Sequence, residues 1–174
     1  MSPIVVIGSI NMDLVCRTPH MPAPGETILG GDFLTVPGGK GANQAVAAAR
    51  LASAGLAVHM VGRVGADDFG DRLLAGLRNH SVQTRYVTVT EKMASGVAMI
   101  LVDRKGENSI VVAPGANALV SPADVDAAAE IPGRYGIAAV PTLILFKDGR
   151  VVEKITGLLP KADLRKKIEA MLAA

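Results

Sequence analysis

Residues 37–50 read Pro-Gly-Gly-Lys-Gly-Ala-Asn-Gln-Ala-Val-Ala-Ala-Ala-Arg, a glycine-rich loop that runs directly into an alanine-rich segment. Asn43 near the start of this segment and Gly55 beyond its end predict a helix over residues 41–54. The glycines let a ligand approach main-chain N–H groups at the helix start, where the dipole also favours negative charge. A loop that binds a polar ligand and a plain tight turn both remain possible at this point.

This loop lacks the signatures of two common nucleotide-binding loops. No Gly-Lys-Ser/Thr occurs, which excludes a P-loop, and the third glycine of a dinucleotide fingerprint is missing. A polar, non-nucleotide ligand is therefore the interpretation that we carry forward.

Two polar side chains follow the first apolar segment of the chain. Residues 3–10 are rich in Ile and Val, which predicts a central parallel strand that is buried on both faces. Asn11 and Asp13 would lie just past its C-terminal end, where open α/β sheets bind ligands. We expect them to share a cleft with Lys40 and Asn43. One carboxylate and two amides suit the adjacent hydroxyls of a polyol, whereas spacing alone also allows a turn-capping role.

The rest of the chain predicts an α/β fold with a small antiparallel flap. After the flap (14–36) and the first helix, we expect a strand over 56–64, a helix from Asp67 past Leu77, strands over 84–90, 95–103 and 108–113, and a short helix from Ser121 to about Glu130. Ile131-Pro132-Gly133 would stop that helix. An Asp-Gly turn predicts a hairpin over 142–155, and a last helix follows over about 160–173.

Composition narrows the class of protein. The chain has 174 residues, of which 49% are hydrophobic, enough for one core. The single cysteine, Cys16, excludes an internal disulfide and a CxxC pair and indicates a cytoplasmic protein. No stretch has the length of a bilayer span and no basic region precedes the first apolar run, so we expect neither membrane insertion nor export.

The charge is unevenly distributed, with a net −2 over residues 1–130 and +4 over 131–174. We interpret the basic run at 165–167 as a solvated helix face and expect no nucleic-acid binding. The three histidines show no ligand spacing, so no metal site is expected. Cys16 is interpreted as a small apolar residue, and the aspartates at 67–71 as helix caps.

Several motifs recur in order along the first three quarters of the chain. They are Gly-Ser-Ile-Asn-Met-Asp at 8–13, Pro-Gly-Glu-Thr at 24–27, the run at 38–50, Gly-Ala-Asp-Asp-Phe-Gly at 65–70, Gly-Glu-Asn at 106–108 and Gly-Ala-Asn at 115–117. Together they resemble the ribokinase-like family of carbohydrate kinases over residues 1 to about 130. The resemblance implies that ribose hydroxyls are held by Asn11, Asp13, Gly39, Lys40 and Asn43, with Ala98 and Val112 as apolar contacts.

The same resemblance implies a lid, formed by 14–36 and 95–113, through which a homodimer would form. The family transfers phosphate from ATP to the 5-hydroxyl of ribose with magnesium and a monovalent cation. Its catalytic Asp and adenine pocket follow a Gly-Ala-Gly-Asp-like motif, and no such motif follows residue 117 here. We therefore assign no catalytic residue and expect binding without turnover, with ATP and the cations required only if kinase activity survives.

The last part of the chain carries a different resemblance. The sequence from Tyr135 through Arg150, continuing into the final helix, resembles the C-terminal part of thioredoxin and implies a cis peptide at Val140-Pro141. The thioredoxin dithiol is absent, which excludes redox catalysis. We interpret the chain as a chimera, engineered or accidental, in which a thioredoxin-like segment (131–174) supplies strands and a covering helix to a ribokinase-like sugar-binding segment (1–130).

Two other functions remain open from the sequence. The chain would retain ribokinase activity if a complementary half restored the missing site. Alternatively, it is a non-catalytic scaffold whose thioredoxin-like piece binds peptides beside Pro141.

Overall fold

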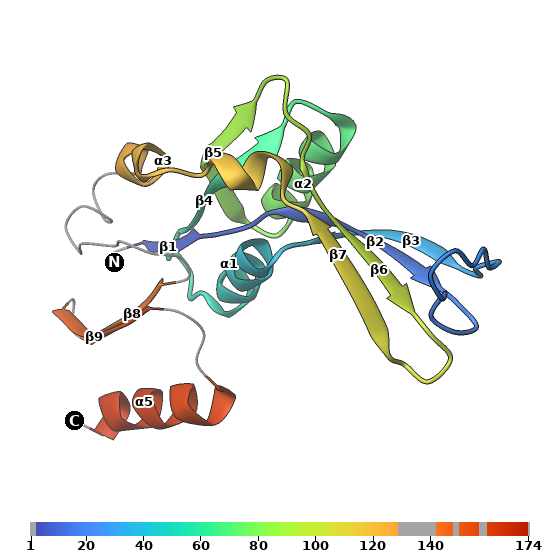
Figure 1. Cartoon of the computed structure of the whole chain (residues 1–174). Coiled ribbons are helices and arrows are strands. Elements are labelled where there is room, and N and C mark those ends of the chain that lie inside the picture. Colours follow the sequence, from blue (N-terminus) through green and yellow to red (C-terminus); the bar gives the residue numbers. More distant parts are fainter. Residues whose placement is uncertain (1–2, 129–141, 148–149, 157–159, 174) are drawn as a thin grey trace.

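The computed structural model describes residues 3–128, 142–147, 150–156 and 160–173, and it has a mixed α/β architecture (Figure 1). Within these residues, β1-β4-β5 form a parallel sheet, β3-β2-β6-β7 form a second sheet, and β8-β9 form a hairpin. The elements are β1 (Ile4–Ile7), β2 (Asn11–Arg17), β3 (Phe33–Gly38), α1 (Lys40–Leu51), β4 (Val58–Gly65), α2 (Asp68–Asn79), β5 (Val82–Thr90), β6 (Gly96–Val102), β7 (Asn108–Ala113), η1 (Gly115–Leu119), α3 (Pro122–Ala127), β8 (Thr142–Lys147), β9 (Arg150–Thr156) and α5 (Lys161–Ala173). The predicted α/β class is confirmed.

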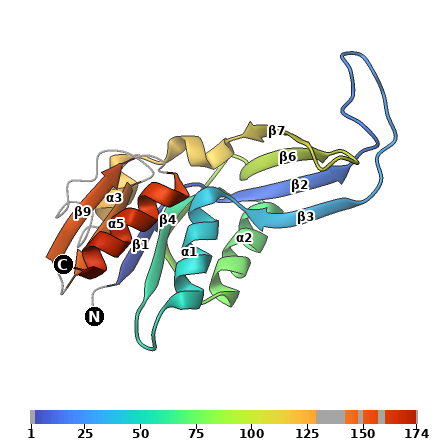
Figure 2. The same cartoon turned by 90° about the horizontal axis from the view of Figure 1, so that it is seen from below.

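Helices α1 and α2 lie side by side against the parallel sheet and form the core with it (Figure 2). Ala42 and Ala45 of α1 and three leucines of α2 pack on Met60 and the buried valines of the central strand β4. Asp67 caps α2 as predicted, because its Oδ1 accepts a 2.8 Å hydrogen bond from the Gly70 N–H. The first helix ends at Leu51 rather than at residue 54, since the backbone is already extended at Ala52.

The first strand differs from the prediction in two ways. β1 ends at Ile7 and, among the described residues, lies at the edge of the sheet next to β4. Its four residues are half-buried rather than enclosed on both faces. The chain leaves this sheet at Gly8, against which α1 packs so closely that a Cβ there would lie 3.0 Å from the Gly41 Cα. Of the apolar run at 3–10, only Ile4–Ile7 therefore form a strand, residues 8–10 connect the two sheets, and Asn11 begins a strand instead of a loop.

The predicted flap is the four-stranded sheet, which projects from the body of the molecule with the loop 18–32 at its far end (Figures 1 and 2). β2 pairs antiparallel with β3 and parallel with β6, and β6 pairs antiparallel with β7. The turn between β6 and β7 is closed by Asp103, whose Oδ1 accepts hydrogen bonds from the Lys105 and Glu107 N–H groups at 2.7 and 3.0 Å.

Helix α3 starts where the sequence predicts, with Ser121 as its cap and Pro122 as its first residue, but it ends at Ala127. Its Asp124 is buried and forms an ion pair with Arg63 of β4, at 2.8 Å. This pair fixes α3 against the parallel sheet. The expected stop at Ile131-Pro132-Gly133 lies outside the described residues.

The last hairpin and helix form where they were predicted, but the hairpin does not complete the parallel sheet. β8 and β9 pair antiparallel with each other, and within the described residues they join neither of the other sheets. Glu153 of β9 forms an ion pair with Lys167 of α5. The Asp148-Gly149 turn and the Val140-Pro141 peptide lie outside the described residues.

None of the described helices combines the length and the hydrophobicity that a bilayer span requires.

Candidate functional site

Strand β2 carries two of the predicted site residues on one face of the four-stranded sheet. Asn11 and Asp13 are two residues apart, so their side chains leave the strand on the same side. Asn11 is buried and Asp13 is half-buried. Both positions therefore belong to a sheet surface, whereas the sequence placed them in a loop past a strand end.

Asp13 heads a row of residues that crosses this sheet. Its register partner on β3 is Val36, its partner on β6 is Ala98, and Ala98 in turn pairs with Val112 on β7. Paired residues share a face, so the structure brings together the three predicted positions Asp13, Ala98 and Val112. Ala98 is 5% exposed and Val112 is 54% exposed, so the row is buried beside the Asp13 carboxylate and exposed to solvent at its β7 end.

Because Gly38 has no side chain, the Asp13 carboxylate has space beside it. A Cβ at Gly38 would lie far inside van der Waals distance of the Asp13 carboxylate atoms. Burial raises the pKa of Asp13 above its ordinary value. A carboxylate that is poorly compensated in this way is a strong acceptor for a ligand hydroxyl.

Asn11 is fixed by a residue that the sequence analysis did not assign to the site. The Asn117 Nδ2 donates to the Asn11 Oδ1 at 2.8 Å and to the Ile10 carbonyl at 3.0 Å, while the Ile10 N–H donates to the Asn117 Oδ1 at 2.9 Å. Gly96 makes room for this contact, because a Cβ there would lie 2.5 Å from the Asn11 Oδ1. The Gly-Ala-Asn motif at 115–117 was the available signal.

The glycine-rich loop joins the sheet to α1 and requires glycine at Gly39. Its φ is +95°, and a Cβ there would lie 2.6 Å from the Ser9 carbonyl oxygen and 2.8 Å from the Asn11 nitrogen. The Ala42 N–H donates to the same Ser9 oxygen at 3.1 Å. The start of α1 is thereby held against the segment that leads into β2.

The two remaining predicted residues, Lys40 and Asn43, lie exposed in the first turn of α1. A cavity of about 360 Å³ opens between α1, α2 and β3, and of the predicted residues it takes in Asn43 only. Gly38 and Arg50 also line it. The predicted site residues therefore fall into two groups, one on the four-stranded sheet and one at the start of α1. The two groups are adjacent where Gly39 lies close to the Asn11 backbone nitrogen.

Among the residues that the structure describes, no cluster of carboxylate, histidine and cysteine side chains could hold a metal ion such as magnesium. Asp124 is the one buried carboxylate among them, and both its oxygens are already engaged. The Arg63 Nε donates to its Oδ2 at 3.0 Å, the Thr88 hydroxyl to its Oδ1 at 3.2 Å and the Ser121 N–H to its Oδ2 at 2.8 Å. This carboxylate is structural, and no phosphoryl-transfer step is assigned to it.

A parallel sheet that carries two helices and a projecting sheet with an Asn-Asp pair beside a glycine-rich helix start define a carbohydrate-kinase type of domain. The model of the family described as pfkB family carbohydrate kinase matches residues 1–135, and the chain belongs to this family. The model described as Thioredoxin matches residues 108–170, so the two matches overlap over 108–135.

Similar proteins agree with this assignment. A ribokinase of Bacillus subtilis is 51% identical over 123 residues, which are 71% of this chain and 41% of that protein. A structure of ribokinase from Giardia lamblia has a TM-score of 0.65 at 38% identity and covers 75% of this chain and 39% of that one. The Arabidopsis thaliana ribokinase complexed with ribose and ATP has a TM-score of 0.59 at 36% identity, over 66% of this chain and 36% of that one. The chain thus spans about two fifths of the length of the curated relatives it matches.

Proposed function

We propose that the chain binds a ribose-type sugar on the face of the four-stranded sheet that carries Asn11 and Asp13. The observation that supports this most directly is the row in which Asp13, Ala98 and Val112 lie in register across three strands. It combines one hydrogen-bonding carboxylate with small apolar contacts, as a sugar ring requires. The family assignment and the relatives named ribokinase support the same class of ligand.

Each predicted residue has a role in this proposal. The Asp13 carboxylate accepts hydrogen bonds from sugar hydroxyls, and the Asn11 amide, oriented by Asn117, binds a neighbouring hydroxyl. Gly39 lets the ring approach the backbone, and Lys40 and Asn43 add donors from the start of α1. Ala98 and Val112 contact the apolar edge of the ring.

Calorimetric titration with ribose tests the proposal. We expect saturable heat for the unmodified chain and none for Asp13→Asn, which keeps the size of the side chain but removes its charge. Asp126→Asn is the matched control, because Asp126 is an exposed aspartate of α3. Equal binding by the Asp13→Asn chain and the control would refute the assignment.

A second candidate function is phosphorylation of the sugar, alone or with a complementary half of a kinase. The relatives named ribokinase favour it, whereas the commitment of Asp124 to Arg63 speaks against it for the chain alone. ADP release from ATP, magnesium and ribose measures it directly. We expect none, and release that rises with chain concentration would establish the activity.

The thioredoxin match supports a third element of the proposal, in which residues 131–174 derive from a thioredoxin-like segment joined to a ribokinase-like segment at 1–130. A scaffold function would then rest on peptide binding beside Pro141. A peptide-display selection that recovers no binder, while titration with ribose still gives heat, would contradict the scaffold function and support sugar binding.

Homodimer formation through the lid belongs to the same proposal. The four-stranded sheet exposes large apolar side chains on both faces, among them Phe33, Leu34, Val111 and Val112. Sedimentation equilibrium of the unmodified chain and of Phe33→Ser tests it, and we expect the substitution to weaken self-association. A monomer at all concentrations would rule the dimer out.

A further inference from the structure

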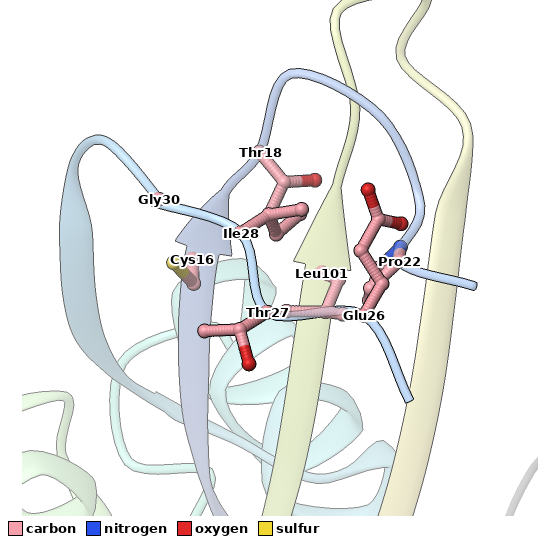
Figure 3. Close-up of a pocket in the computed structure, with 8 residues that line it drawn as sticks. All are labelled: Cys16, Thr18, Pro22, Glu26, Thr27, Ile28, Gly30 and Leu101. Atoms are coloured by element: carbon pink, nitrogen blue, oxygen red, sulfur yellow. The ribbon is translucent and has the colours of Figure 1, made fainter. Parts of the chain in front are cut away.

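A second cavity, of about 310 Å³, lies under the loop 18–32 that joins β2 to β3 (Figure 3). We propose that it binds a small uncharged molecule that carries one hydroxyl group on an apolar body. The proposal rests on the position of the cavity, on a buried hydroxyl group that lines it and on the charge of its walls.

The cavity is separate from the proposed sugar site. Cys16, which lines it, is three residues after Asp13 on the same strand, so the two side chains leave the sheet on opposite faces. Leu101 of β6 is the register partner of Cys16 and forms the floor beside it. A ligand here would therefore lie behind the sheet, away from the row that Asp13 heads.

Thr18 supplies the buried hydroxyl group of the cavity, whereas Thr27, which also lines it, is exposed. It is 7% exposed, and its N–H is satisfied by the Val102 carbonyl at 2.9 Å. Its hydroxyl has no hydrogen-bond partner, and Figure 3 shows this oxygen directed toward the space beside Ile28 and above Leu101. A buried hydroxyl without a partner is costly, and a ligand hydroxyl placed in the cavity would remove that cost.

The remaining walls select an uncharged, largely apolar body. Ile28, Leu101 and Pro22 supply aliphatic surface, and no lysine or arginine lines the cavity. The carboxylate of Glu26 is already committed, because it accepts from the Ala23 N–H at 2.8 Å and pairs with the His20 Nε2 at 2.9 Å. A charged ligand would find no free counter-charge, whereas a single hydroxyl would find Thr18.

Cys16 makes occupancy of the cavity measurable. It is the sole cysteine of the chain, and its sulfur lies against Gly30, where a Cβ would come within 2.6 Å. Its rate of alkylation by iodoacetamide therefore reports on this cavity alone. A molecule bound over the thiol should slow that reaction.

The probes are 4-methylphenol and 1,4-dimethylbenzene. They have nearly the same shape, and the hydroxyl group of the first is replaced by a methyl group in the second. We expect 4-methylphenol to protect Cys16 with a dissociation constant of about 1 mM, which is typical of a ligand of this size, and to be preferred over 1,4-dimethylbenzene. Thr18→Val, which keeps the shape of the side chain, should reduce this preference at least about fivefold. Thr18→Ser should retain it.

Asp13→Asn should leave the protection unchanged, since that residue lies on the other face. Backbone amide NMR shifts of Thr18 and Gly30 in the unmodified chain give a second measurement that needs no variant. Absence of both protection and shifts at about 10 mM 4-methylphenol would overturn the proposal. The same holds for equal protection by the two probes, or for a preference that survives Thr18→Val.

Discussion

Asn117 holds the side chain of Asn11 through a 2.8 Å hydrogen bond between its Nδ2 and the Asn11 Oδ1, although 106 residues of chain separate the two. The same amide group closes both hydrogen bonds of the Ile10 backbone. One side chain thus fixes the point at which the chain passes from the parallel sheet into the projecting sheet.

Removing this clamp should affect both stability and binding. Asn117→Ala leaves the Ile10 N–H and the Asn11 amide without a partner, and we expect a loss of about 2–3 kcal/mol in the free energy of unfolding. Ribose affinity should fall as well, because Asn11 loses its orientation. Urea unfolding and calorimetry measure the two effects. Asn108→Ala, at an exposed asparagine of β7, is the control and should change neither.

Two neighbouring glycines should respond differently to the same substitution. In Gly38→Ala the three atoms nearest to the new methyl group all belong to the Asp13 side chain, which can move, so we expect lost ribose binding with little loss of stability. In Gly39→Ala it meets backbone atoms at 2.6 and 2.8 Å, and φ is +95°, so the free energy of unfolding should fall by about 1–3 kcal/mol. Equal stability losses in the two variants would contradict this contrast.

The Arg63–Asp124 pair predicts a pH dependence of stability. Burial of the Asp124 carboxyl would raise its pKa, but the hydrogen bonds from Arg63 and Ser121 outweigh burial and hold the pKa below its ordinary value. The folded-state pKa is therefore lower than the unfolded one, so the stabilisation is complete above the ordinary aspartate range. It is lost as the pH falls through the lowered pKa. Unfolding free energies measured against pH should show a shallower acid decline in Asp124→Asn.

The partner substitution tests the same pair from the other side. Arg63→Met leaves a buried carboxylate uncompensated and should cost about 3 kcal/mol near neutral pH. The double variant Arg63→Met with Asp124→Leu should recover part of this loss. A double variant that is no more stable than Arg63→Met would show that the charge is not the cause.

The Asp13 carboxylate, which is proposed to bind the sugar, should lower the stability of the folded chain. Burial raises the pKa of its carboxyl, so its charged form destabilises the folded chain above that raised pKa. This penalty is relieved as the pH falls through the raised pKa, and it is gone below the ordinary aspartate value. Asp13→Asn should therefore be more stable than the unmodified chain near neutral pH, with a difference that shrinks on acidification. Thermal unfolding at several pH values measures this, and a less stable variant at neutral pH would contradict it.

The sequence predicted local structure well where one signal dominated. The caps at Asp67 and Ser121 form as expected, and so does the start of the alanine-rich helix after Gly39, because capping groups act within a few residues. The apolar run at 3–10 was interpreted wrongly, since its pattern does not reveal that the chain changes sheets at Gly8.

The candidate site was predictable in its residues but not in its arrangement. Asn11, Asp13 and the glycine loop stood out by residue type, but the register that sets Asp13 opposite Ala98 depends on pairing between distant strands. Asn117 was missed as a site residue because its contacts are all with residues far away or with its own turn. Within the part of the chain that the structure describes, β8 pairs with β9 alone, and this likewise could not be read from their pattern.

The parallel pairing of β2 with β6 has a consequence for biosynthesis. Of the residues proposed to bind the sugar, those from Asn11 to Asn43 are translated before β6. This strand pairs with β2 beside Asp13 and begins only at Gly96. Until β6 has been translated, β2 can pair only with β3, and its other edge stays open. The nascent chain must therefore carry an incomplete binding surface until β6, which ends at Val102, has been translated, and a chaperone that shields this edge would act in that interval.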